Sequence, residues 1–236
     1  MVFNANKLDK NFKFDFKQDF EEVTIPSFDS NKLHAILFKS VNSKGLVFYL
    51  HGNASALNTW GNISKIYTDL GYDIFILDYR GFGKSQGINE NEAQVNQDIQ
   101  IVYDTILKKY PEEQVVLIGY SIGTGIATYL ASTNNPKALI LQAPYYNFLE
   151  LSGVRVPFVP DFLKKFKFET NRFITKVKAP IYIFHGKKDL LINYQNANRL
   201  HKIIKSTDLL FLLENQGHIG INENLVYQEN LRLLLE

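Results

Sequence analysis

The chain has 236 residues, of which 45% are hydrophobic, enough to bury the core of one large globular domain. Its formal net charge is only +2 and it has no long basic run, so nucleic acid is not expected as a partner. The absence of cysteine excludes disulfide bonds, thiolate metal sites and a cysteine nucleophile.

Residues 1–20 alternate phenylalanine with charged and polar residues, and they lack the apolar run of a signal peptide. No stretch of the sequence reaches the roughly 18 apolar residues that a membrane span requires. We therefore expect a cytoplasmic protein with no membrane span.

Short apolar runs then alternate with longer segments of helical period, a pattern typical of parallel strands joined by crossover helices. The predicted strands are 23–26, 33–38, 46–50, 73–79, 114–118, 138–142, 181–184 and 209–213. The predicted helices are 57–70, 90–109, 122–131, 194–205 and 222–235. The pattern predicts an α/β fold with about eight mostly parallel strands, flanked by helices, in a single domain over residues 1–236.

Residues 145–178 form an insertion that is far longer than the usual connection of about two to six residues. An excursion of this kind at the carboxyl edge of a parallel sheet usually covers a site, so we expect Tyr145, Phe158 and Phe162 to contact substrate. Within it, residues 147–178 carry a net charge of +4, while the rest of the chain carries −2. A basic, aromatic cap suits an acyl chain with a negative head group, and it is compatible with peripheral membrane contact. The alternative is a solvated loop whose aromatic rings pack on the sheet.

The predicted strand 114–118 leads directly into Gly119-Tyr120-Ser121-Ile122-Gly123, and a helical pattern follows. This G-x-S-x-G motif, between a strand and a helix, is typical of a nucleophile elbow. Glycine is needed on both sides of the serine because the chain approaches itself closely around so tight a turn. Ser121 is therefore the predicted nucleophile, with Tyr120 beside the substrate.

A serine nucleophile needs a base and an acid that orients the base. Of the five histidines, only His218 follows the last predicted strand, at the same sheet edge as the elbow; the others are His34, His51, His185 and His201. We interpret His51 and His185, each before a glycine at the end of a strand, as turn-shaping residues. Asp189 follows the seventh strand and gives the chain order Ser, Asp, His. Asp208 lies too early, at the start of the final strand.

Acyl transfer also requires donors for the oxyanion. One predicted donor is the backbone N–H of Ile122, directly after the nucleophile. The second should come from the turn after the third strand, His51-Gly52-Asn53-Ala54, where either Asn53 or Ala54 could donate and Asn53 is favoured.

Together these residues resemble the α/β-hydrolase superfamily over nearly the whole chain. The closer resemblance is to a subgroup with H-G-N-A, here residues 51–54, and D-x-R-G-x-G-x-S, here residues 78–85. That subgroup includes serine peptidase-like hydrolases, esterases, lysophospholipase-like enzymes and acyl-protein thioesterases. We interpret Asp78 and Arg80 as residues that brace loops near the site, the alternative being a plain surface turn. The chain lacks an N-terminal anchor and a cysteine-rich segment, so a membrane-tethered depalmitoylase is not expected.

The resemblance implies hydrolysis of a small-molecule carboxylic ester or thioester with no metal and no organic cofactor. A serine peptidase acting on short peptides is the alternative among enzymes, although its cap would need more acidic residues. A non-catalytic binding protein on a hydrolase scaffold is the alternative from another class.

Overall fold

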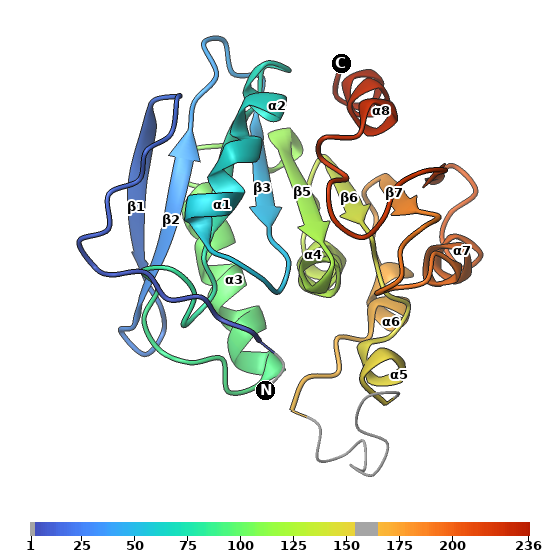
Figure 1. The fold of residues 1–236 in the computed structure, drawn as a ribbon, viewed down its shortest axis with the longest axis horizontal. Coiled ribbons are helices and arrows are strands. Elements are labelled where there is room, and N and C mark those ends of the chain that lie inside the picture. Colours follow the sequence, from blue (N-terminus) through green and yellow to red (C-terminus); the bar gives the residue numbers. More distant parts are fainter. Residues whose placement is uncertain (1–2, 154–164) are drawn as a thin grey trace.

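The computed structural model describes residues 3–153 and 165–236. One eight-stranded sheet runs through the molecule in the order β1-β2-β4-β3-β5-β6-β7-β8 (Figure 1). The strands are β1 (Phe20–Pro26), β2 (Lys32–Phe38), β3 (Leu46–Leu50), β4 (Asp73–Leu77), β5 (Val115–Tyr120), β6 (Ala138–Gln142), β7 (Ile181–Gly186) and β8 (Leu209–Leu213). The β1–β2 and β2–β4 pairs are antiparallel, and every other neighbouring pair is parallel. The predicted fold class is confirmed.

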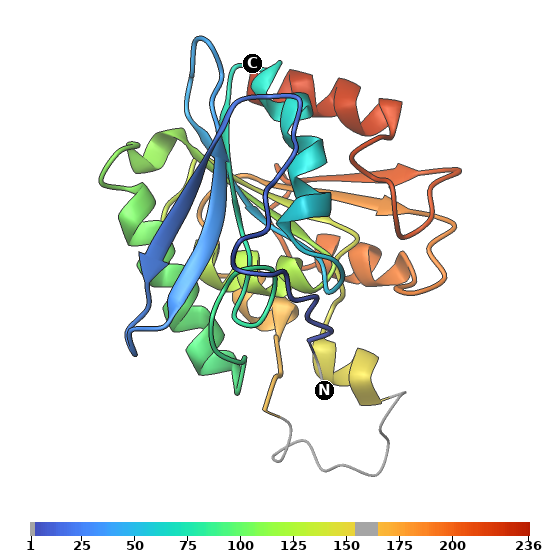
Figure 2. The same ribbon diagram turned by 60° about the vertical axis from the view of Figure 1, so that its left-hand side comes forward.

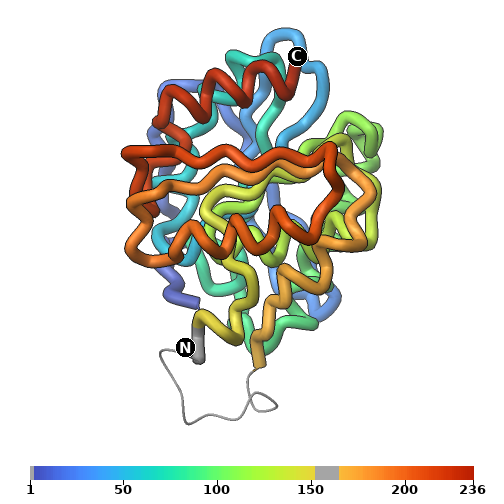
Figure 3. Tube along the Cα trace, turned by 90° about the vertical axis from the view of Figure 1, so that its right-hand side faces the viewer, coloured from blue at the N-terminus to red at the C-terminus, as the bar shows by residue number. Residues whose placement is uncertain are grey.

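The central strands are apolar on both faces because helices cover the sheet on both sides. All residues of β3, β4, β5 and β6 are buried. One face packs against α3 (Glu92–Ile106), α4 (Ile122–Thr133), α6 (Thr170–Ile174) and α7 (Gln195–His201). The other packs against α1 (Leu57–Trp60), α2 (Ser64–Thr68) and α8 (Leu225–Leu235). Figures 2 and 3 show the two layers, with α8 and α7 on opposite sides of the sheet.

Strand boundaries follow the sequence prediction closely, since 46–50, 138–142 and 209–213 are found unchanged. The predicted helix 57–70 is wrong as one element, because a 3₁₀ turn at Gly61–Ile63 separates α1 from α2. Gly61 lies directly under the Phe16 ring, leaving no room for a side chain, and glycine is a poor former of helix interiors.

The N-terminal segment (residues 3–8) passes over the carboxyl edge of the sheet, next to the loop after β4 (Figure 1). Leu8 donates its backbone N–H to the carbonyl of Gly83 at 3.0 Å, and Gly83 donates to Asn6 at 2.8 Å. Phe3 is buried, and its ring contacts the rings of Phe166 and Phe168 at centroid distances of 5.3 and 6.2 Å. This segment therefore joins the β4 loop to the end of the insertion, beside which lies α5 (Phe148–Gly153).

Candidate active site

Ser121 occupies the turn between β5 and α4, in a backbone conformation that L-residues rarely adopt, with φ 52° and ψ −117°. The turn is held by Ser121 itself, whose N–H donates to the carbonyl of Gln142 on β6 at 2.9 Å. A side chain at Gly119 would collide with the backbone of Gly123, and one at Gly123 would collide with the carbonyl of Leu50. The two glycines therefore permit the sharp turn that presents the serine at the sheet edge.

The structure brings Ser121, His218 and Asp189 together from three separate loops. His218 Nε2 lies 3.1 Å from Ser121 Oγ, and His218 Nδ1 lies 2.7 Å from Asp189 Oδ2. The Asp189 side chain is completely buried, whereas that of His218 is 14% exposed. A buried acid, a partly open imidazole and a serine at these distances have the geometry of an activated nucleophile.

Asp189 is held as a carboxylate. Burial alone would raise its pKa, but hydrogen bonds from His185, from His218 and from the backbone of Ile192 together hold the pKa well below the ordinary value of 3.8. Its other oxygen, Oδ1, accepts the N–H groups of Leu191 and Ile192, both at 2.8 Å. Both carboxylate oxygens are thus fixed, which fixes the direction of the bond to His218.

His185 was predicted to shape a turn, and the structure adds a contact that the sequence did not reveal. The ring is fully buried, with Nε2 at 2.8 Å from the carbonyl of Ile192 and 3.2 Å from Asp189 Oδ2. Two histidines therefore share one carboxylate oxygen. The spacing H-G-x-x-D, which places His185 four residues before Asp189, is the only sequence signal for this contact.

Both predicted oxyanion donors belong to segments next to the nucleophile. Ile122 is the first residue of α4, and an N–H at that position has no acceptor within its own helix. A side chain added at Gly52 would lie 3.6 Å from Ser121 Cβ, so the turn that includes Asn53 runs beside the serine. The Asn53 side chain points elsewhere, because its Oδ1 accepts the backbone N–H of Asn4 at 2.8 Å. No pattern in the sequence predicts this link to the N-terminal segment.

Aromatic side chains border the triad. The Tyr120 hydroxyl donates to the backbone carbonyl of His218, and the two rings meet edge to face at 5.9 Å. Trp60, which is partly exposed, packs against Tyr120 at 5.3 Å and near Gly52. Tyr120 therefore holds the histidine loop as well as lying beside the site, and Trp60 is a neighbour that the sequence analysis did not single out.

Tyr145 does not lie where a substrate contact was predicted. Its side chain is fully buried, and its hydroxyl donates to the carbonyl of Ile122 at 3.3 Å. The ring packs against α4, where Gly125 leaves space for it, so Tyr145 supports the elbow helix from within the core. The predicted contacts Phe158 and Phe162 lie outside the described residues.

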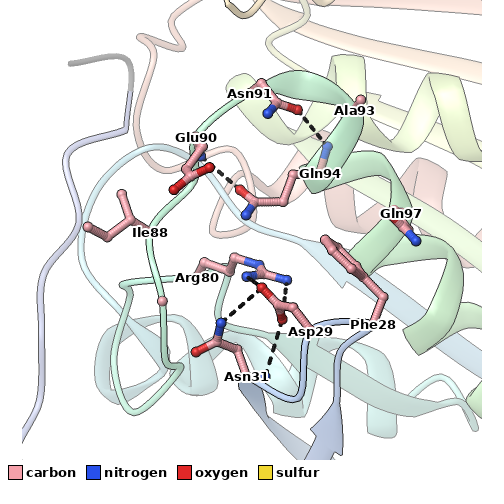
Figure 4. A pocket seen from close by; sticks show the side chains of 11 residues that line it. Phe28, Asp29, Asn31, Arg80, Ile88, Glu90, Asn91, Ala93, Gln94 and Gln97 are labelled. Atoms are coloured by element: carbon pink, nitrogen blue, oxygen red, sulfur yellow. Dashed lines mark hydrogen bonds and ion pairs between the residues drawn. The ribbon is translucent and has the colours of Figure 1, made fainter.

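Arg80 braces loops, as the sequence predicted. Its guanidinium pairs with Asp98 on α3 and with Asp29 in the β1–β2 turn, the latter at 2.6 Å, while Asn89 donates to its backbone carbonyl. Figure 4 shows Arg80 and Asp29 side by side in the lining of a cavity of about 580 Å³. No triad residue lines this cavity. Asp78 is buried, with Oδ1 at 3.4 Å from His51 Nε2 and 3.2 Å from the N–H of Leu57.

Among residues 3–153 and 165–236, no group of three or more His, Cys, Asp or Glu side chains is arranged to hold a metal ion. In the same part of the chain, no helix has both the length and the apolar character to cross a membrane.

The strand order, the elbow on the central strand and the helices on both faces define the α/β-hydrolase fold. Comparison with solved structures agrees. The chain superimposes on an esterase from Pyrococcus furiosus with a TM-score of 0.74 and 18% identity, covering 99% of this chain and 97% of that one. An esterase from Exiguobacterium antarcticum gives a TM-score of 0.70 and 22% identity, covering 91% and 99%.

A family described as serine aminopeptidase, S33, matches residues 41–174, more than half of the chain. Human alpha/beta hydrolase domain-containing protein 17B is 31% identical over 82% of this chain and 67% of its own length. Lysophosphatidylserine lipase ABHD12 of Macaca fascicularis is 29% identical over 69% of this chain and 46% of its own. The chain spans about half to two thirds of the length of these curated relatives. It belongs to the S33 family of α/β-hydrolases.

Proposed function

We propose that the protein hydrolyses a carboxylic ester or thioester through an acyl-enzyme, with Ser121 as nucleophile, His218 as base and Asp189 as orienting acid. The observation that carries this proposal is the unbroken chain of short contacts, 3.1 Å from Ser121 Oγ to His218 and 2.7 Å from His218 to Asp189. The cytoplasmic location stays a prediction from the sequence.

In the first step Ser121 Oγ bonds to the substrate carbonyl carbon while its proton passes to His218 Nε2. The carbonyl oxygen becomes an anion that the N–H groups of Ile122 and Asn53 stabilise. The tetrahedral intermediate collapses, the bond to the alcohol or thiol breaks, and the leaving group takes the proton from His218. Asp189 remains ionised throughout and stabilises the imidazolium.

In the second step a water molecule replaces the alcohol or thiol. His218 takes a proton from the water as its oxygen attacks the acyl carbon. Collapse of the second intermediate breaks the bond to Ser121 Oγ, which recovers its proton from His218. The products are a carboxylic acid and the free enzyme, and no cofactor takes part.

The family description gives weight to a second candidate, a serine peptidase acting on short peptides. Recognition of a free N-terminus would need an available carboxylate near the site. In the described part of the insertion, Glu150 pairs with Arg199 at 2.7 Å and Glu169 pairs with Arg172 at 3.1 Å. Both carboxylates are therefore engaged. The names esterase and lysophosphatidylserine lipase among the similar proteins also favour ester cleavage.

Labelling with a fluorophosphonate tests the proposal. The reagent should modify Ser121 stoichiometrically, and Ser121→Ala should abolish labelling and lower kcat by roughly 10⁶-fold. Ser132, whose hydroxyl donates to the backbone carbonyl of Tyr129 on α4, provides a matched control. Ser132→Ala should leave both the labelling and kcat unchanged. Labelling at another serine, or no labelling of a folded protein, would contradict the assignment.

A panel of esters, thioesters and aminoacyl amides with graded acyl length then separates the candidates. Turnover of esters and thioesters, with no turnover of aminoacyl amides, supports the proposal. A preference for aminoacyl amides would favour the peptidase.

Each methylene group of a substrate that is buried on binding contributes roughly 0.8 kcal/mol to the binding free energy. If Phe158 and Phe162 bind the acyl chain, their replacement by Ala should flatten the length preference and spare acetate.

A further inference from the structure

The last residues of β7 include a second histidine within reach of the triad acid. His185 Nε2 lies 3.2 Å from Asp189 Oδ2, the same oxygen that accepts from His218, and 2.8 Å from the carbonyl of Ile192. His185 and the Asp189 side chain are both fully buried. No water separates these groups at such distances, so the contact is direct.

The hydrogen-bond partners determine the tautomer of His185. Both groups facing Nε2 are acceptors, a carbonyl and a carboxylate, so the ring proton lies on Nε2. The other nitrogen, Nδ1, is buried and has no hydrogen-bond partner among the residues that the structure describes. A buried nitrogen without a hydrogen-bond partner lowers the free energy of unfolding. Such a nitrogen is tolerated where the other nitrogen of the ring makes a necessary contact.

We propose that His185 is a positioning residue for the hydrolytic reaction: its Nε2–H fixes the Asp189 carboxylate and withdraws part of its charge. The inference rests on the proposed function. Asp189 Oδ2 then faces two donors, Nδ1–H of His218 and Nε2–H of His185. Holding the carboxylate in this way sets how strongly it attracts the imidazolium of His218 during the reaction.

Two substitutions separate positioning from packing. In His185→Gln the amide nitrogen lies the same number of bonds from Cα as Nε2, so a donor is kept. His185→Met has similar bulk and no donor. We expect kcat of His185→Met to fall on the order of tenfold with little change in KM, and His185→Gln to restore most of it.

The pH profile provides a readout that packing alone would not move. Without the His185 donor, Asp189 attracts protonated His218 more strongly, so the acid limb of kcat/KM should move to higher pH in His185→Met and return in His185→Gln. The other ionisable groups nearby are Tyr120, whose pKa burial raises above its ordinary value, and the exposed Lys188 and Glu223. All three are common to the three proteins compared.

Nuclear magnetic resonance tests the same contact without turnover. The His218 Nδ1–H proton bonded to Asp189 should give a low-field resonance that shifts in His185→Met and returns in His185→Gln. Nitrogen-15 shifts of the wild-type protein should show the His185 proton on Nε2. A proton on Nδ1 of His185 in the wild-type protein would overturn the inference, and this result does not depend on whether His185→Met folds. A folded His185→Met with the wild-type pH limb and the wild-type resonance would also overturn it. Failure of Ser121 to label, with these spectra as expected, would instead reject the proposed function alone.

Discussion

Asp189 and Asp208 are both buried aspartates, but they lie at opposite edges of the sheet. Asp189 follows β7, and Asp208 comes directly before β8. Asp189 lies at the carboxyl edge against His218, while Asp208 accepts the backbone N–H groups of Ile181 and Lys205 at 2.9 and 3.1 Å. The first arrangement orients an imidazole, and the second joins the start of β7 to the turn before β8. Their substitutions should therefore affect different measurements.

We predict that Asp189→Asn lowers kcat by roughly 10⁴-fold, because an amide favours the wrong tautomer of His218. Asp208→Asn should keep kcat within about threefold and lower the melting temperature, since an amide nitrogen replaces one of the two oxygens that accept backbone N–H groups. Steady-state kinetics and thermal unfolding of both variants check this. A silent Asp189→Asn beside an inactive Asp208→Asn would show that the acid was wrongly assigned.

Ser121, Asp189 and His218 could be proposed from the sequence because each follows an apolar run that predicts a strand, and parallel strands place such loops at one edge of the sheet. The orientation of a ring cannot be obtained in this way. His185 lies at the end of β7 and Tyr145 follows β6, but His185 contacts Asp189 whereas Tyr145 is enclosed beneath α4. Which of these environments a side chain enters depends on packing among residues distant in the chain.

Among the elements, the N-terminal segment has a larger role than its sequence suggested. Phe3 packs against Tyr79, Phe82, Phe166 and Phe168, and Asn4 holds the Asn53 side chain. The contact between Asn4 and Asn53 spans 49 positions, and neither residue carries a local pattern that predicts it. Strands, in contrast, were predictable because their apolar runs are local.

Phe3→Ala should therefore affect both stability and turnover. Removing a buried phenyl ring costs about 3 kcal/mol of the free energy of unfolding. Release of Asn4 should also let the oxyanion turn move, lowering kcat severalfold with little change in KM. Phe28→Ala is the matched control, because Phe28 is 48% exposed and lies away from the triad. Denaturant unfolding measures the free energy of unfolding, and steady-state kinetics measures kcat. Equal losses of both quantities in Phe3→Ala and Phe28→Ala would contradict the role assigned to Phe3.

At the scale of the whole molecule, several ionisable groups have pKa values below their ordinary values, and each of these shifts makes the folded state less stable at low pH. Burial lowers the pKa of His34 below 6.5, outweighing its hydrogen bond to Glu22. The hydrogen bonds from Arg80 lower the pKa of Asp29, and those around Asp189 lower its pKa despite burial. In each case the unfolded chain binds the proton more readily than the folded one.

The sign follows directly, because protonation then favours unfolding. We predict that stability is full above about pH 7 and falls on acidification in two stages: first below about pH 6.5 as His34 protonates, then below about pH 4 through the carboxylates. Denaturant unfolding at a series of pH values measures both. His34→Gln should remove the upper stage and leave the lower one, while His201→Gln, at an exposed position, should change neither. An upper stage that survives His34→Gln would contradict the assignment.

Organisation as a single domain over residues 1–236, with the insertion as a cap, stays a prediction. The described parts support a close relation between insertion and sheet, since Glu92 of α3 accepts the backbone N–H groups of Lys167 and Phe168 at 2.7 and 2.9 Å. These two hydrogen bonds fix the returning end of the insertion beside the N-terminal segment.

Trp60 is the only tryptophan in the chain, and it packs against Tyr120 and Gly52 next to the elbow. Emission excited at the red edge of protein absorption therefore originates from one indole, which shares the neighbour Gly52 with Ser121. Substrate binding to the purified protein can therefore be followed by the intrinsic fluorescence of Trp60, without an attached dye. The time course of that emission in a stopped-flow instrument would resolve acylation from deacylation, with Trp60→Phe as the dark reference.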